Sequence, residues 1–272
     1  MNIRLVLIAL LAISVVGCAK VDTATSREVD LGHHFAGYSG CFVMLDVGRN
    51  AYVRYNPSRC DERLSPCSTF KIPNSLIGLE TGVVSGAGHA IRWDRRGHRR
   101  KVLNRDHDLR SAIEHSVVWY YQAVASRVGE KRMAEALASL EYGNMDMSGG
   151  LTQFWLEDSL KISANEQVRF LQRLHLGTLP FSKRSQEIVR DILVQYADDA
   201  GVLRGKTGSG RAGIGWFVGT IERPETVFMF ALNITGANAW GGKAREICLS
   251  VLRELIGERG LPSAENARVA QR

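Results

Sequence analysis

The residues best suited to covalent chemistry are a serine and a lysine three positions apart, Ser68 and Lys71. Residues at this spacing share one face of a helix, so the hydroxyl and the amine can meet. Serine becomes a nucleophile when a neighbouring base takes its proton. Lysine can be that base when its pKa is lowered or when it is chemically modified. Taken alone, a Ser-x-x-Lys pattern also occurs by chance in many helices.

A second candidate lies near the other end of the chain, in Lys206-Thr207-Gly208. On a strand, the glycine lets a ligand approach the backbone closely, and the lysine suits an anionic group on that ligand. A nucleotide-binding loop is excluded, because Ala200 occupies the position where such a loop needs glycine and because a strand follows instead of a helix.

Together, Ser-x-x-Lys early and Lys-Thr-Gly late, about 135 residues apart, form the signature of penicillin-recognising serine enzymes. Five motifs stand in the order Pro66–Asn74, Ser116-Val117-Val118, Tyr142-Gly143-Asn144, a Trp-containing loop made of Phe154–Glu157 and Ser159–Ser163, and Lys206-Thr207-Gly208. Through these motifs the chain resembles the class D serine β-lactamases, the oxacillinases, over about residues 38–257, and it lacks the Ser-Asp-Asn of class A and the Tyr-Ala-Asn of class C.

The resemblance implies catalytic roles. Ser68 attacks the lactam carbonyl, and Lys71, carbamylated by CO₂ or bicarbonate, is the general base. Trp155 donates a hydrogen bond to the carbamate. Ser116, helped by Lys206, relays a proton to the leaving nitrogen, and the backbone N–H groups of Ser68 and Ser209 form an oxyanion hole. No metal or other cofactor is expected.

The resemblance also implies substrate-binding residues. Arg245, with Thr207 and Lys206, binds the carboxylate of the drug, and the alternative is a surface arginine on an amphipathic helix. Gly208 belongs to the same strand motif. Val118 and Leu156 are apolar lids over the carbamate. The expected function is hydrolysis of β-lactams, giving antibiotic resistance, and the alternatives are a penicillin sensor that is acylated without turnover and a peptidoglycan transpeptidase.

Composition is that of a soluble globular protein of 272 residues, with 45% hydrophobic and 23% charged residues. It excludes collagen, intrinsic disorder and a polytopic membrane protein. The net charge is +7, and a basic run over Arg92–Lys101 could suggest nucleic-acid binding. That run contains a single aromatic residue, so we predict a solvated loop and no nucleic-acid partner.

The N-terminus predicts an export signal over residues 1–18, with Arg4 before an apolar run over Leu5–Val16 that is shorter than the ~20 residues of a spanning helix. The preferred interpretation is a lipoprotein signal, with lipidation of Cys18. The alternatives are cleavage after Ala19 and a buried N-terminal helix. Export predicts a periplasmic protein, membrane-anchored if Cys18 is lipidated.

Hydrophobic patterning predicts an α/β fold of the α+β type. A central antiparallel sheet comes from both chain ends, is flanked by helices and is interrupted by an inserted helical region, as in the serine β-lactamase and penicillin-binding fold. We expect a tether over 19–38, a catalytic domain over 39–257 and a frayed tail over 258–272. Strands are expected at 41–47, 51–55, 203–207, 214–221 and 226–234, and helices at 69–80, 109–128, 131–140, 165–176, 182–193 and 243–256.

The cysteines leave several pairings open. Cys41 begins one strand of a predicted hairpin and Cys60 lies just past the other strand, so the two could form a disulfide, whereas Cys67 could pair with Cys60 or remain a thiol. Cys248 is predicted to lie in the core of the last helix. The oligomeric state is equally open, as a monomer or a homodimer.

Overall fold

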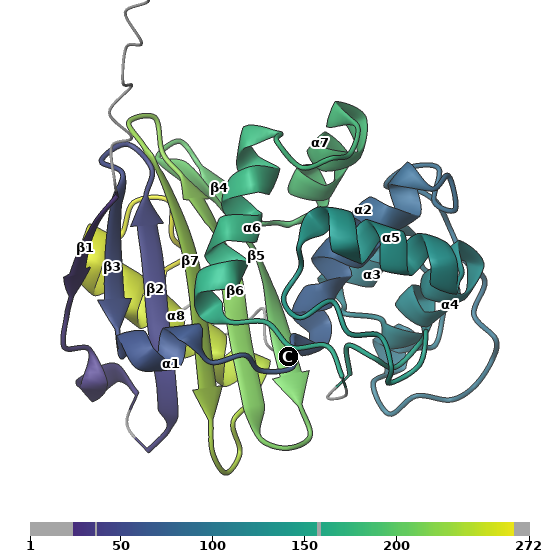
Figure 1. The fold of residues 1–272 in the computed structure, drawn as a ribbon, viewed down its shortest axis with the longest axis horizontal. Helices are drawn as coiled ribbons and strands as arrows, with labels where there is room; N and C mark the ends of the chain where they lie inside the picture. Colours follow the sequence, from purple (N-terminus) through teal and green to yellow (C-terminus); the bar gives the residue numbers. More distant parts are fainter. Residues whose placement is uncertain (1–23, 36, 157–158, 264–272) are drawn as a thin grey trace, which may run out of the picture.

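One seven-stranded sheet organises the protein in the computed structural model, which describes residues 24–35, 37–156 and 159–263 (Figure 1). The strand order is β1-β3-β2-β7-β6-β5-β4. The strands are β1 (Thr25–Glu28), β2 (Ser39–Asp46), β3 (Ala51–Tyr55), β4 (Val194–Asp198), β5 (Gly201–Gly210), β6 (Ile214–Glu222) and β7 (Val227–Thr235). Since β2 pairs with β7, the two ends of the chain meet in the middle of the sheet, as predicted.

Helices cover both faces of the sheet and form a lobe beside it (Figure 1). The α-helices are α1 (Pro57–Asp61), α2 (Lys71–Glu80), α3 (Leu109–Glu114), α4 (Val118–Val128), α5 (Glu130–Leu140), α6 (Ala164–Leu176), α7 (Lys183–Ile192) and α8 (Gly241–Ile256). Three short 3₁₀ helices are η1 (Gly32–His34), η2 (Cys67–Phe70) and η3 (Lys101–Leu103). α8 packs on one face of the sheet and α6 on the other, next to the lobe.

Strand alternation divides the apolar side chains into two cores. Successive residues of β2 point to opposite faces, as the two-residue period of a strand requires. Val43 and Leu45 join the core under α2, α4 and α6, which we call the lobe core. Phe42 and Met44 join the core under α8, which we call the α8 core. The inserted helical region predicted from the sequence therefore covers the lobe core and not the α8 core.

The described parts of the predicted tether and tail, residues 24–35 and 258–263, are packed on the domain instead of being flexible or frayed. β1 pairs in parallel with β3, so one pair of the sheet departs from the antiparallel pattern. Leu31 and Phe35 are buried, which fixes the chain well before residue 38. At the other end, Leu261 is buried, and the backbone carbonyl of Arg259 accepts hydrogen bonds from Arg223. Buried apolar side chains and satisfied backbone carbonyls hold residues 24–35 and 258–263 on the domain.

Several element boundaries also differ from the predictions. The single helix expected over 109–128 is two helices, because the chain turns between α3 and α4. The helix expected from residue 69 begins as the 3₁₀ helix η2. The sequence patterns did not predict the short elements α1 and β4.

The predicted export signal and Cys18 lie outside the described residues. Within the described part of the chain, none of the helices has the length and apolar character needed to cross a membrane. The basic run over 92–101 lies in the largely exposed connection between α2 and α3.

Cys41, Cys60, Cys67 and Cys248 are buried, and none of these four cysteines forms a disulfide. The structure brings Cys41 to Cys60 without a disulfide, and a hydrogen bond with Cys60, together with burial, raises the pKa of the Cys41 thiol well above its usual value. Cys248 lies in the α8 core, as predicted.

Candidate active site

Ser68 lies on the 3₁₀ turn that leads into α2. The preceding residue, Cys67, has a φ of 49°, a left-handed conformation that is uncommon for a side chain of this kind. Such backbone outliers concentrate at functional sites. Ser68 is half-buried, and its Oγ accepts a hydrogen bond of 2.7 Å from Lys71 Nζ. The serine hydroxyl and lysine amine predicted to act together are therefore in direct contact.

Lys71 is completely buried, which is rare for a lysine. Burial lowers its pKa well below the usual value, and the positive charge of Lys206 lowers it further, whereas Cys67 acts in the opposite direction. Its Nζ also lies 5.6 Å from the centre of the buried Tyr121 ring. Because an apolar surround disfavours the ammonium form, burial favours the neutral amine of Lys71.

Trp155 carries a buried hydrogen-bond donor without a partner. Its side chain is fully buried, and its Nε1 makes no hydrogen bond to any described residue. An unsatisfied buried donor costs about 1–3 kcal/mol, so its retention calls for an explanation. The indole stacks on Phe70, the residue that precedes Lys71, with ring centres 5.3 Å apart. Ser65 fixes the segment, because its Oγ donates to the Trp155 carbonyl oxygen over 3.2 Å.

Strand β5 places Lys206 beside the serine turn. Lys206 is buried, and its Nζ donates a hydrogen bond of 3.2 Å to the carbonyl oxygen of Thr207. Burial, followed by the nearby charge of Arg100, lowers the pKa of Lys206 to about 7. Gly208 makes the close approach possible, because a Cβ there would lie 2.9 Å from the carbonyl oxygen of Pro66.

The second motif lies at the turn between α3 and α4. Ser116 is half-buried and has a φ of 56°, so a second left-handed residue flanks the site. Arg100 reaches this turn, since its Nη1 donates to the carbonyl oxygen of His115 over 3.1 Å. Arg100 was assigned to a solvated loop from the sequence, and only its contacts in the fold associate it with Lys206 and the second motif.

The two predicted lids occupy different elements. Val118 is the first residue of α4, and its side chain is half-buried. Leu156 follows Trp155 and packs against the lobe core, also half-buried. Glu157, the next residue of that motif, lies outside the described residues.

Arg245 lies on the α8 face of the sheet. Thr207 is paired with Phe217, so both side chains point to that face, and the Arg245 guanidinium carbon lies 5.8 Å from the centre of the Phe217 ring. Arg245 is buried, and its Nε donates to Gln195 Oε1 over 3.2 Å. Arg245 therefore lies on the same face of the sheet as Thr207. It is buried there, whereas the alternative interpretation required a surface arginine.

Tyr142-Gly143-Asn144 braces the loop that carries Trp155. Asn144 Oδ1 accepts from the backbone N–H of Lys161 over 2.8 Å, and its Nδ2 donates to the carbonyl oxygen of Ser159 over 2.9 Å. Gly143 has a φ of 59°, and a Cβ there would lie 2.0 Å from the Lys161 carbonyl oxygen, so other residues are excluded. The motif holds the loop in place, as its residue types predicted.

A half-buried serine in contact with a buried lysine, beside a second buried lysine on β5, is an arrangement suited to acyl transfer to serine. The family described as "Penicillin binding protein transpeptidase domain" matches residues 40–256. A curated relative, "Probable beta-lactamase YbxI" of Bacillus subtilis (strain 168), is 37% identical over 91% of this chain and 95% of its own length.

Solved structures agree with this assignment. One, described as "Class D beta-lactamase BAT-2 delta mutant", has a TM-score of 0.81 at 40% identity and covers 84% of this chain and 96% of its own. The chain belongs to the class D β-lactamase family, as its motifs predicted. Another similar structure is the "C-terminal domain of the Bacillus licheniformis BlaR penicillin-receptor", with a TM-score of 0.83 at 33% identity, covering 86% of this chain and 98% of its own. The same fold is thus used by a receptor.

Proposed function

We propose that this protein hydrolyses β-lactam antibiotics through an ester on Ser68, with Lys71 as the general base in its carbamylated form. The observation that carries the proposal is the direct contact of 2.7 Å between Lys71 Nζ and Ser68 Oγ at a fully buried lysine. In the first half of the reaction the Ser68 oxygen bonds to the lactam carbonyl carbon, and the ring C–N bond breaks. In the second half, water attacks the ester and releases Ser68.

Carbamylation requires an unprotonated amine, which the lowered pKa of Lys71 supplies. The amine nitrogen bonds to the carbon of CO₂ and loses a proton, which converts a buried base into an anionic one that can take a proton from a hydroxyl or water. The Nε1–H of Trp155, unpartnered among the described residues, suits an added acceptor of this kind. The unpartnered Nε1–H of Trp155 is the reason to assign the carbamate to Lys71 and not to Lys206.

Ser116 and Lys206 supply the proton to the lactam nitrogen in this proposal. A lysine with a pKa of about 7 exists in both protonation states near neutrality, which suits it to passing a proton on. The backbone N–H groups of Ser68 and Ser209 are proposed to stabilise the developing oxyanion. Thr207 and Arg245 are proposed to bind the carboxylate of the substrate, with Gly208 leaving room for it and Val118 and Leu156 limiting water at Lys71.

The test is a time course with the chromogenic β-lactam nitrocefin at substrate in large excess. Continuous turnover supports hydrolysis. A single burst equal to the enzyme concentration would contradict it and would favour a sensor, the function that the receptor domain's similarity brings forward, or a transpeptidase. Mass spectrometry after a slow substrate should locate the acyl group on Ser68, and an adduct on Ser116 or Ser65 would overturn the assignment.

The carbamate has its own test, ¹³C NMR in labelled bicarbonate with Lys71→Ala as the matched control. A carbamate signal present only in the wild type supports the proposal. Full activity in rigorously CO₂-free buffer, with no such signal, would return Lys71 to the role of a plain amine base.

We further propose that the chain is exported to the periplasm, anchored through a lipidated Cys18, and confers resistance to β-lactams. The proposal rests on the leader-like composition of residues 1–18 and on the family's activity. Metabolic labelling with a fatty-acid analogue should mark the wild type and not Cys18→Ala, and expression in a susceptible host should raise the inhibitory concentration of a penicillin. Unlabelled wild type or unchanged susceptibility would refute the respective part.

A further inference from the structure

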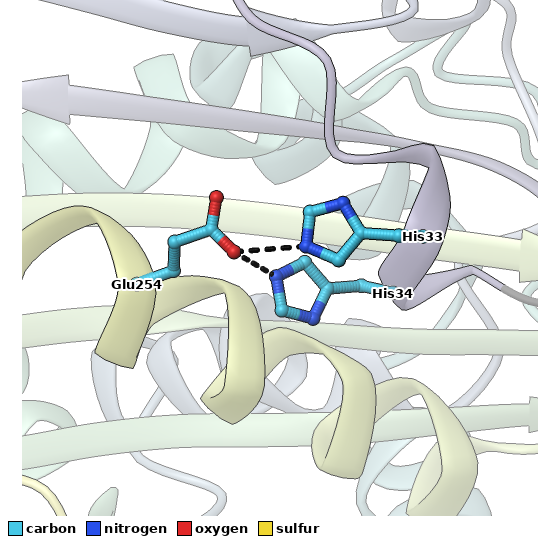
Figure 2. A group of neighbouring side chains, drawn as sticks. All are labelled: His33, His34 and Glu254. Carbon is cyan, nitrogen blue, oxygen red and sulfur yellow. Dashed lines mark hydrogen bonds and ion pairs between the residues drawn. The ribbon is translucent and has the colours of Figure 1, made fainter.

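Two histidines and a glutamate converge on the α8 side of the molecule (Figure 2). His33 Nε2 and His34 Nε2 lie 2.9 Å and 2.7 Å from the same oxygen, Oε2 of Glu254. Of the His, Cys, Asp and Glu side chains that the structure describes, this is the one group of three whose donor atoms all lie within 4.8 Å of one another. The active-site proposal uses none of the three.

The histidines are held on a rigid segment. They belong to η1, and the residues on either side of this short helix, Leu31 and Phe35, are both buried in the α8 core. Phe35 also stacks on Tyr55 of β3, with ring centres 4.6 Å apart. The two imidazole rings lie against each other, 4.1 Å between centres, and both turn toward α8.

The glutamate comes from a second rigid element. Glu254 lies in the last turns of α8, two residues after Leu252, which is buried with Val251 in the α8 core. The three donor atoms therefore meet from elements at opposite ends of the chain, each fixed by its own apolar contacts. Such preorganisation is what a metal site requires of its supporting structure.

We propose that His33, His34 and Glu254 bind a divalent transition-metal ion, with Zn²⁺ as the preferred ion. Two imidazole nitrogens and one carboxylate oxygen form a ligand set typical of zinc with one position open. Calcium and magnesium prefer oxygen ligands alone, so this set disfavours them. His33 is 61% exposed in its side chain, so water can reach the open position.

The observed geometry needs only a small change to accept the ion. Metal–ligand bonds of about 2.0–2.2 Å at tetrahedral angles place two ligand atoms about 3.3 Å apart. The nitrogen–oxygen distances of 2.7 and 2.9 Å must therefore open by roughly half an ångström. Metal binding requires that a proton on either Nε2 leave or move to Nδ1, so that both Nε2 lone pairs face the ion.

A bound ion would connect the segment before β2 to the C-terminal helix. Because it binds the folded chain and the unfolded chain lacks the preformed site, it should raise the melting temperature with increasing metal concentration. The inference is independent of the proposed function, since the cluster uses no residue assigned to the active site.

The experiment is isothermal titration of the tag-free, chelator-treated protein with Zn²⁺. We expect one ion per chain, and a loss of affinity of about tenfold or more in His33→Ala, His34→Ala and Glu254→Gln, because loss of even an outer-shell partner weakens metal sites by 10–100-fold. His89→Ala, which removes a half-buried histidine on the lobe, is the matched control and should bind like the wild type. Ca²⁺ and Mg²⁺ should give no comparable heat.

Three outcomes would overturn the proposal: no Zn²⁺ binding by the wild type, wild-type affinity in both His34→Ala and Glu254→Gln, or weakened binding in His89→Ala alone. Co²⁺ substitution gives a second readout, since visible absorption bands of a four-coordinate ion should appear in the wild type and vanish in Glu254→Gln. Nitrocefin turnover of the metal-free variants should equal that of the wild type. Failure of the metal site and failure of the proposed function are therefore distinguishable.

Discussion

The two cores on either side of the sheet differ in what they bury. The lobe core encloses Lys71 together with other polar side chains such as Asn74 and Ser75, and residues with left-handed backbone lie at its edge. The α8 core is built from the apolar faces of β2, β6, β7 and one long helix, in a regular alternation. The lobe core contains a completely buried lysine and, in Trp155, a buried donor without a partner among the described residues, and both carry an energetic cost. Stability and chemistry are thus distributed to opposite faces of one sheet.

Replacing the nucleophile Ser68 should separate activity from stability most clearly, because it should have the largest effect on activity. Ser68→Ala should lower kcat/KM for nitrocefin by about 10⁴-fold or more, the scale seen when a catalytic serine is removed. Thermal unfolding should be almost unchanged, because Ser68 is half-buried and its partner Lys71 stays in place. Stopped-flow kinetics and calorimetry check the two halves, and substantial residual turnover would contradict the proposed role.

Trp155→Phe tests whether the lobe core retains an unpartnered donor for chemistry. The variant keeps the ring on Phe70 but removes Nε1–H, so we expect deacylation to slow by about 10²–10³-fold and activity to depend more strongly on bicarbonate. Trp119→Phe is the matched control, because the Nε1 of Trp119 donates to the Leu103 carbonyl oxygen and not toward Lys71. An equal loss in both variants would assign the effect to packing.

Arg245 tests the separation of chemistry from stability between the two faces, because it lies on the α8 face and yet is proposed to bind the substrate. Arg245→Ala should raise KM for penicillins about ten- to a hundred-fold, the loss of one charge-assisted contact. Gln195→Ala, which removes the side-chain acceptor of Arg245 Nε, should have a smaller effect of the same kind. Unchanged steady-state kinetics in Arg245→Ala would leave Thr207 and Lys206 as the carboxylate site.

The buried Lys206 should lower the stability of the folded protein in a pH-dependent way. Its pKa falls from 10.5 to about 7 on folding, so between these values the unfolded chain binds more protons than the folded one. Stability should therefore rise with pH across this window, and the destabilisation from Lys206 is complete below about pH 7 and absent above about pH 10.5. Lys206→Met should be more stable than the wild type at pH 7 and show a shallower pH slope in urea unfolding. An identical slope would contradict the buried, shifted lysine.

The smallest effect on catalysis is expected in the α8 core itself. Leu252→Ala removes a fully buried side chain and should lower the free energy of unfolding by about 2–5 kcal/mol. At temperatures where the variant is folded, kcat/KM should stay within about twofold of the wild type. A large loss of activity in the folded variant would show that the two faces are coupled.

Apolar periodicity and turn residues predicted the layout of the chain well, because they report burial directly. The long strands β2, β6 and β7 and the helices α6 and α8 carry strong alternation or helical spacing. β1 was missed because Thr25–Glu28 is polar and exposed, and its pairing with β3 depends on backbone bonds and on the buried Leu31 and Phe35 nearby.

The site was predictable in its residue types and less so in its surroundings. Five motifs placed Ser68, Lys71 and Lys206, since their spacing is fixed by a helix face and a strand. The turn at Ser116 that separates α3 from α4 contains neither glycine nor proline, so the sequence gives no turn signal there. The surrounding fold imposes the left-handed backbone of Ser116. The position of Arg100 near the site could not be predicted either. A long loop brings it there, and loops have no periodic hydrophobic pattern.

The pairing of β2 with β7 also sets an order of events in synthesis. Ser39 lies opposite Thr235, so nearly the whole polypeptide must leave the ribosome before the middle of the sheet can close. Ser68 and Lys206 are both translated earlier, but β5 is anchored to β6 and β6 to β7. Closing so long a loop is slow relative to local helix formation. A nascent chain that ends before Val227 therefore carries both reactive motifs and lacks the central strand that brings them together.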